Sequence, residues 1–427
     1  MSDITLARSL GFGTLVFYGI GDILGAGIYA LVGKVAGVAG NGAWISFMLA
    51  GILALVTGLS YAELGARIPH SAGASAYCAS AFRHPFVPFL IGALVLFSGV
   101  TSTATVALAF QGYLEVLVRM PSLTAAIILI IAINILNFTG IRQATSTNNV
   151  LTLIELGGLI FFVVVCMRYV FSTHTPSELI EKLEPTVNFS AVVAGVTIAF
   201  YAFVGFEDMA NLAEEAKDPV RDVPRAIMSA IIITSLVYLM VIFVVQWIMT
   251  PADASASERP LLAALERAGL PIPAWGFALI AIIAIANTGL ANSIMASRLL
   301  YGMATKGLLP EALAKVHPRR YTPWLSILIT ALLTVLWVVT GGATIMAQTT
   351  GFLLVTIFLF VHLSLIRIRR RDDKQIDHFT APVLNPYLGV LLCIPLLTQF
   401  PYEVYLRIIF IVVVVGILFA VDRWCRN

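Results

Sequence analysis

The residues with the most evident chemical use lie in a glycine-rich stretch near the start of the chain, from Gly19 to Tyr29. A helix buried in lipid must satisfy its own backbone hydrogen bonds, and each interior glycine weakens it by about 1 kcal/mol. The glycines therefore favour a break at Gly25 to Gly27, with a second helical half that begins near Ile28. Free amides at that start bind a carboxylate and free carbonyls at the preceding end bind an ammonium, so the pair suits a free amino acid. Close packing of helices on small residues is the alternative interpretation.

A second stretch, from Phe200 to Asp208, combines one glycine with two acidic residues inside an apolar segment. A charge at the centre of a bilayer costs at least about 2.5 kcal/mol. A segment that carries Glu207 and Asp208 at this depth is therefore expected to be unwound and to line a cavity. Alternatively, the helix is shorter and both acids lie at its cytoplasmic end.

Glu155 is a single acid in the apolar run from Val150 to Gly158. An ionised carboxylate is costly there unless it is paired or protonated. Three interpretations stay open: a proton carrier, a partner for a cation such as a substrate side chain or a bound ion, and a structural partner for a nearby arginine or hydroxyl. Asn292 and Ser293 are candidate neighbours of this site.

The composition defines the elements that position these residues. Of 427 residues, 59% are hydrophobic and 11% are charged, whereas soluble domains carry about 25% charged residues. We therefore expect an all-α integral membrane protein. The net charge of +3 is small and dispersed, so it gives no support for a nucleic-acid partner. The four cysteines lack the spacing of a disulfide framework or a zinc site, and neither a metal nor a cofactor is expected.

Enzyme classes are excluded by the motifs that they require. The sequence has no phosphate-binding loop that ends in lysine and a hydroxyl residue, no HExxH and no GxSxG. It also lacks the filter sequence or ring-forming repeat of a channel. We therefore expect a membrane protein that is not an enzyme, and a channel or a substrate-sensing receptor is less favoured than a transporter.

Apolar runs of about 20 residues, the length that spans a bilayer, predict twelve transmembrane helices. They cover residues 10–36, 43–66, 87–117, 122–140, 149–171, 189–213, 225–249, 274–303, 324–341, 344–366, 384–400 and 404–422. Basic residues are about three times as frequent on one side, which predicts a multi-pass protein of the cell membrane with both termini in the cytoplasm. The outer loops at 172–184 and 250–270 are expected to be short solvated connectors.

The first and sixth predicted segments are both interrupted and lie five segments apart, which is typical of inverted-repeat transporters. We expect a first five-helix repeat at 1–176 and a second at 185–371. Two additional C-terminal helices are expected at 380–427.

Several motifs resemble those of the amino acid-polyamine-organocation (APC) superfamily, and most of all its cationic amino acid transporter branch. They are, in chain order, Gly19–Tyr29, Tyr61–Pro69 with Ser71–Gly73, Ala202–Phe206, Ala213–Pro219 with Val223–Ile227, and Ser297–Ala304 with Lys306–Pro310 and Thr322–Pro323. The resemblance covers the first ten segments. It implies a five-plus-five inverted repeat with broken helices one and six, a substrate held between these helices, and alternating access by the rocking of a bundle.

The resemblance also implies roles for particular residues. The amides of the unwound stretch at Gly25, Ala26 and Gly27 would take the substrate carboxylate. The carbonyls near Ile23 and from Phe200 to Val204 would take the amino group, and Phe203 or Phe206 would close over the substrate.

Two acids depart from the family pattern. Family members often have a small residue in place of Asp22, which either tunes a cation site or hydrogen-bonds to the neighbouring backbone. Sodium-independent relatives commonly have a lysine in place of Glu155, where it stands in for a coupling ion. Because Glu155 has the opposite charge, the lysine mechanism does not transfer directly.

Together these observations predict a secondary active transporter of amino acids, with proton coupling as the expected driving force and amino acid or polyamine exchange as the alternative. The expected partners are the amino acid, a proton and membrane lipid, with anionic lipid near the basic cluster Arg367–Lys374. Glu63 and Arg67, at i and i+4, are expected to be in contact. The sequence leaves the charge of the substrate and the oligomeric state open.

Overall fold

The structure, a computed structural model, describes residues 10–68, 73–139, 144–184, 189–209, 216–269, 273–305, 309–320, 322–371 and 379–426. In these ranges the chain is almost entirely helical, and nine helical stretches are long and apolar enough to cross a membrane. The predicted class of an all-helical, multi-pass membrane protein is therefore confirmed. The count of twelve spans and the repeat stay predictions, because α1, α14 and α16 have only 12, 15 and 13 residues against the roughly 20 that a span needs.

Every predicted segment coincides with helical structure. The first part of the chain forms α1 (Phe12–Ile23), α2 (Ala26–Ala39), α3 (Ala43–Arg67), α4 (Gly73–Ala81), α5 (Phe86–Leu114), α6 (Ser122–Thr139), α7 (Ala144–Thr173) and α8 (Pro176–Glu181). The remainder forms α9 (Phe189–Ala199), the 3₁₀ helix η2 (Phe200–Phe203), α10 (Pro219–Ile248), α11 (Pro251–Ala256), α12 (Pro260–Arg267), α13 (Ala274–Thr305), α14 (Trp324–Val338), α15 (Ala343–Arg371), α16 (Asn385–Leu397) and α17 (Tyr402–Arg426).

The first interruption lies between α1 and α2. Leu24 and Gly25 are not helical, and the extended backbone of Gly25 (φ −149°, ψ −153°) turns the chain into α2. The helix is thus broken where the glycine spacing predicts. The second half begins at Ala26 rather than near Ile28, because the amide of Ala26 finds a capping partner in the side chain of Thr288.

The second interruption follows α9, where the α-helix ends at Ala199 and the chain continues as η2. The turn after η2 contains Gly205 at φ +122°, a conformation that favours glycine. A Cβ on Gly205 would lie 2.5 Å from the carbonyl oxygen of Asp22, so no larger residue fits. The two interruptions therefore touch each other.

The chain segments outside the two interruptions are also joined. The amide of Lys217, just before α10, donates a hydrogen bond of 2.9 Å to the carbonyl of Leu10, just before α1. Leu10 and Ala216 thereby form an isolated parallel bridge.

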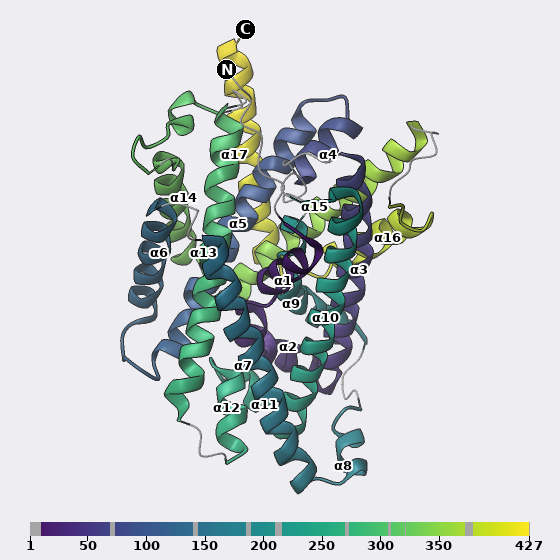
Figure 1. The fold of residues 1–427 in the computed structure, drawn as a ribbon, viewed down its shortest axis with the longest axis vertical. Coiled ribbons are helices and arrows are strands. Elements are labelled where there is room, and N and C mark those ends of the chain that lie inside the picture. The colour runs from purple at the N-terminus through teal and green to yellow at the C-terminus, as the bar shows by residue number, and fades with distance from the viewer. Residues whose placement is uncertain are drawn as a thin grey trace.

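The surrounding helices hold the interrupted elements at the centre of the molecule (Figure 1). Helix α10 packs against α1 and α3, and α13 packs against α5 and α7. Helix α4 lies near one end of the long axis, whereas α8 and α12 lie near the other (Figure 1). Helix α17 exposes large apolar side chains such as Leu406, Ile409 and Phe410, as a helix that faces lipid does.

The prediction of a short solvated connector at residues 250–270 is wrong. This loop folds into α11 and α12, and α12 buries Leu261, Leu262 and Leu265. Lys34 of α2 donates a hydrogen bond of 2.9 Å to the carbonyl of Ser255 and forms an ion pair of 3.0 Å with Glu258. The apolar face of α12 and these contacts attach the loop to the end of α2.

Candidate functional site

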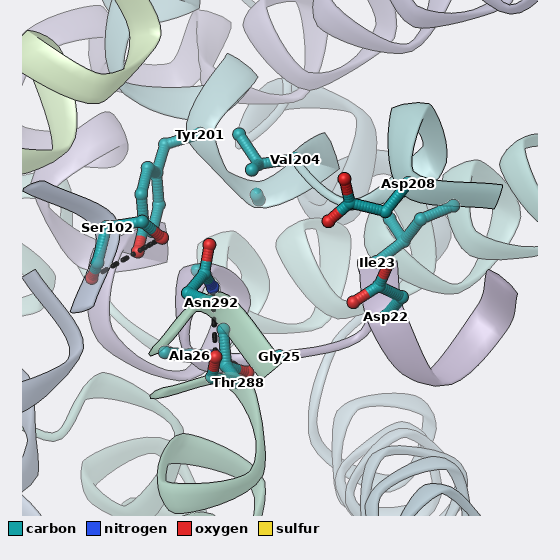
Figure 2. A pocket seen from close by; sticks show the side chains of 13 residues that line it. Asp22, Ile23, Gly25, Ala26, Ser102, Tyr201, Val204, Asp208, Thr288 and Asn292 are labelled. Carbon is teal, nitrogen blue, oxygen red and sulfur yellow. Dashed lines mark hydrogen bonds between the residues drawn. The ribbon is translucent and has the colours of Figure 1, made fainter. Parts of the chain in front are cut away.

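A cavity lies between the two interruptions and combines polar groups from α1, α2, α5, α13 and the chain around η2 (Figure 2). Its lining consists of Asp22, Ile23, Gly25, Ala26, Gly27, Ser102, Tyr201, Ala202, Val204, Gly205, Asp208, Thr288 and Asn292. The volume open to the centre of a water molecule is about 10 Å³, which is room for about one water. A larger ligand such as an amino acid requires the lining elements to move apart.

The donor end of the cavity is the start of α2. The amide of Ala26 donates to the Oγ1 atom of Thr288 at 3.2 Å, and the hydroxyl of Thr288 donates to the carbonyl of Ala284 at 3.1 Å. A Cβ on Gly27 would lie 2.5 Å from the Cα atom of Ala202, so α2 and η2 are in direct backbone contact. The start of a helix suits an anion, and here the Oγ1 atom of Thr288 is the acceptor at that position.

The acceptor end of the cavity is formed by two carbonyls, one from each interruption. The hydroxyl oxygen of Tyr238 on α10 lies 2.6 Å from the carbonyl oxygen of Ile23 and 2.8 Å from that of Ala202. Tyr238 is fully buried, and its ring packs against Phe47 and Phe203. Since a hydroxyl has one hydrogen, the two carbonyls converge on a single donor.

Two carboxylates face the same side of the cavity, with Ser102 and Tyr201 on the opposite side (Figure 2). Asp22 interacts electrostatically with Asp208 and with Glu207. The Oδ2 atom of Asp22 is buried and has no hydrogen-bond partner among the described residues, whereas Glu207 accepts a 3.0 Å hydrogen bond from the amide of Gly205.

Glu155 of α7 lies outside the cavity lining and is fully buried. Asn287 of α13 lies within reach of its carboxylate, but neither oxygen forms a complete hydrogen bond with a described residue. Glu155 also interacts electrostatically with Asp22. Glu155, Asp22, Asp208 and Glu207 thus form a carboxylate row across α7, α1 and the second interruption. No described lysine or arginine forms an ion pair with any of the four.

The structure brings eight of the predicted site residues to the cavity. These are Asp22, Ile23, Gly25, Ala26, Gly27, Val204, Asp208 and Asn292. Ile28, in the first turn of α2, is fully buried and does not line the cavity. Ser293, a candidate neighbour of Glu155, instead donates a hydrogen bond of 2.8 Å to the Oδ1 atom of Asn134 on α6.

The predicted phenylalanines also lie away from the cavity lining in this conformation. Phe200 and Phe206 pack against Phe358 of α15, and Phe203 packs against Tyr238. The cause is the 3₁₀ geometry of η2, in which residues three apart share a face. Tyr201 and Val204 therefore point to the cavity together.

Tyr201, Ala202 and Gly205 also line the cavity and lie in the stretch from Phe200 to Asp208 that was expected to do so, whereas sequence reasoning missed two lining residues, Ser102 and Thr288. One signal was available, since Thr101, Ser102 and Thr103 form a run of hydroxyl residues inside an apolar segment. The hydroxyls of Ser102 and Tyr201 are 2.9 Å apart and join α5 to η2. Thr288 had no comparable signal, because an isolated threonine in a helix most often bonds to its own backbone.

Comparison with known proteins gives one family and several relatives. The family model described as amino acid permease matches residues 10–421. The chain is 24% identical to the branched-chain amino acid permease BcaP of Bacillus subtilis, over 94% of this chain and 90% of that protein. It is 30% identical to the cationic amino acid transporter 4 of mouse, over 86% of this chain and 60% of that protein. It is 29% identical to the methylthioribose transporter of B. subtilis, over 75% of this chain and 72% of that protein.

Proposed function

Because this chain belongs to the amino acid permease family, we propose that it is a secondary active transporter that moves amino acids by alternating access and is driven by protons. Membership of the family confirms the resemblance to the APC superfamily and makes the protein a transporter rather than an enzyme. The driving force, the site residues and the inverted repeat are parts of the proposal.

The observation that carries the proposal is the convergence of two opposite helix ends on one cavity. The amides at the start of α2, from Gly25 to Gly27, take the substrate carboxylate, and the carbonyls of Ile23 and Ala202 take the ammonium. Thr288 releases the amide of Ala26 when the carboxylate arrives. Tyr238 holds the two carbonyls at the separation that one ammonium needs.

The carboxylate row supplies the coupling in this proposal. Glu155 is fully buried and Asp22, Glu207 and Asp208 are half-buried. Four such carboxylates without a described cationic partner cannot all be ionised in a medium of low dielectric constant. A proton on Glu155 lowers the charge of the row on one side of the membrane and leaves on the other. A cationic substrate side chain near Asp22 and Asp208 also lowers the net negative charge of the row. The row therefore influences whether neutral or cationic substrates bind.

We assign this conformation to a contracted state of the transport cycle, because the cavity has room for about one water molecule. We assign residues 1–176 and 185–371 to the two five-helix repeats and residues 380–427 to the additional C-terminal helices. Both termini lie in the cytoplasm and the protein lies in the cell membrane in this proposal, as the distribution of basic residues predicts.

Uptake by the purified protein in proteoliposomes tests the proposal. Labelled neutral, cationic and acidic amino acids are each offered with and without an inward proton gradient, and protein-free vesicles are the control. We expect one class to accumulate only when the gradient is present. Uptake that requires unlabelled amino acid inside the vesicles identifies an exchanger and overturns proton coupling. Absence of uptake for every amino acid in both formats overturns amino acid transport.

A further inference from the structure

A second cavity lies at the ends of α3 and α15, remote from the carboxylate row. Its volume is about 230 Å³, and its lining consists of Arg67, Ile68, Ser80, Ile368 and Arg371. By the basic-residue pattern this end of the molecule faces the cytoplasm. The cavity therefore combines two guanidinium groups with two apolar side chains at the level of a membrane surface.

Arg67 contributes an unsatisfied donor to this region. Its side chain is only 10% exposed, and its Nε and Nη2 atoms lie 3.0 and 2.8 Å from the Oε1 atom of Glu63. Its Nη1 atom is buried and has no hydrogen-bond partner among the described residues. A buried guanidinium donor without an acceptor is costly, so this atom indicates a missing anionic or polar ligand.

The local charge also favours an anion. Glu63 is the shared ion-pair partner of two arginines, because Arg369 also donates hydrogen bonds to both of its carboxylate oxygens. Arg371 adds a further positive charge, and its Nη1 atom donates a hydrogen bond of 3.2 Å to the carbonyl of Ser80. Among the described residues around the cavity, positive charge is thus in excess.

We propose that this cavity binds a phosphate group between Arg67 and Arg371. Guanidinium groups bind phosphate through paired hydrogen bonds, and the cytoplasmic leaflet is rich in anionic lipid. The phosphate comes from a lipid headgroup, with Ile68 and Ile368 in contact with its first apolar atoms, or from free phosphate in solution. Because Glu63 also joins α3 to α15, a phosphate on Arg67 acts directly on the contact between these two helices.

The test compares Arg371→Gln with Arg370→Gln in the purified full-length protein. Both variants remove one positive charge from the end of α15, but only Arg371 lines the cavity. Ser80→Trp is a third variant, since it fills the cavity from an exposed lining position and keeps the charge. Native mass spectrometry then counts phosphatidylglycerol retained from mixed phosphatidylcholine and phosphatidylglycerol micelles, and thermal shift measures stabilisation by inorganic phosphate.

We expect wild type and Arg370→Gln to retain one more phosphatidylglycerol than Arg371→Gln and Ser80→Trp, with binding about tenfold weaker in Arg371→Gln. Stabilisation by inorganic phosphate alone, lost in Arg371→Gln but not in Arg370→Gln, identifies free phosphate as the ligand instead. Equal losses in both arginine variants show attraction to surface charge and overturn the site. Binding that is unchanged in Arg371→Gln and in Ser80→Trp overturns it as well.

Discussion

Two glutamates of this protein are fully buried, yet their surroundings differ in every other respect. Glu63, at the end of α3, receives hydrogen bonds from the side chains of Arg67 and Arg369 and from the amide of Ala381. Glu155, in the middle of α7, has no complete hydrogen bond with a described residue. The first site is a brace between three chain segments. The second is a carboxylate with the amide of Asn287 nearby and no ion pair with a described lysine or arginine.

In the proposed mechanism this difference separates stability, which depends on Glu63, from transport, which depends on Glu155. A buried charge with several donors is costly to disturb, because removal of one partner leaves the others unpaired. A buried carboxylate without a cationic partner contributes little to stability, and in the proposed mechanism it changes its protonation.

The largest loss of stability is expected for Glu63→Gln. Arg67 and Arg369 then lose their common counter-charge in a buried position, and the free energy of unfolding falls by about 3–5 kcal/mol. Thermal unfolding in detergent measures this loss. Glu258→Gln, which removes the exposed partner of Lys34, is the control and is expected to leave the melting temperature almost unchanged. Similar small shifts in both variants would remove the role of Glu63 as a brace.

A smaller loss of stability with a large loss of binding is expected for Gly27→Ala. The added Cβ lies 2.5 Å from the backbone of Ala202, which cannot move aside as a side chain does. Such overpacking costs about 1–3 kcal/mol and displaces the start of α2 from η2. Substrate-dependent stabilisation measures the binding. Gly276→Ala on α13 has open space around its Cβ and is the matched control. Normal substrate affinity in Gly27→Ala would contradict the site at the two interruptions.

Tyr238→Phe removes a single oxygen from the acceptor end of the cavity. The carbonyls of Ile23 and Ala202 lose their shared donor, which costs about 1–3 kcal/mol and weakens substrate binding. Tyr77→Phe is the control, because the buried hydroxyl of Tyr77 has no hydrogen-bond partner among the described residues. The unfolding temperature and substrate affinity of both variants give the comparison. Equal unfolding temperatures and equal substrate affinities in the two variants would show that the hydroxyl of Tyr238 supports neither stability nor binding.

Glu155→Gln is expected to leave stability unchanged or slightly raised, because it removes a buried ionisable group that has no cationic partner among the described residues. Uptake driven by a proton gradient is expected to disappear, while exchange between preloaded vesicles persists. The transport assay with and without the gradient separates these activities. If proton-driven uptake is unchanged, Glu155 does not carry the coupling proton.

The smallest effect is expected for the exposed ion pair of α11 and α12. Hydrogen bonds from Arg267 and Thr250 hold the pKa of Asp253 below its usual range. A carboxyl whose pKa is lowered by folding adds stability above its unfolded pKa, near 4, and loses it as the pH falls further. Asp253→Asn should therefore differ slightly from the wild type in melting temperature at neutral pH, and the difference should shrink below about pH 4. A difference that grows at low pH would contradict this assignment.

Local patterns in the sequence predicted much of the fold and part of the site. The glycines around Gly25 predicted the first interruption, and the spacing of Glu63 and Arg67 predicted their contact, because each depends on neighbours within one or two helical turns. Arg369 and Tyr238 were not predicted as partners of Glu63 and Ile23. They are 306 and 215 residues away along the chain, so only the packing of helices brings them together.

Which residues of η2 face the cavity could not be predicted from the sequence either. The family resemblance favoured Phe203 or Phe206 as the residue over the substrate, whereas the 3₁₀ turn presents Tyr201 and Val204. The sequence of this turn carries no sign of which helix type it adopts. The contact between Gly205 and Asp22 likewise depends on the packing of two segments far apart in the chain.

The hydrogen bond between Lys217 and Leu10 has a mechanical consequence. It ties the chain that enters the first broken helix to the chain that leaves the second, at a distance of 2.9 Å. Neither segment can swing through a large angle alone without rupturing this link. Separating the two segments costs about 1 kcal/mol, so the link favours conformations in which the chain flanking one break moves together with the chain flanking the other.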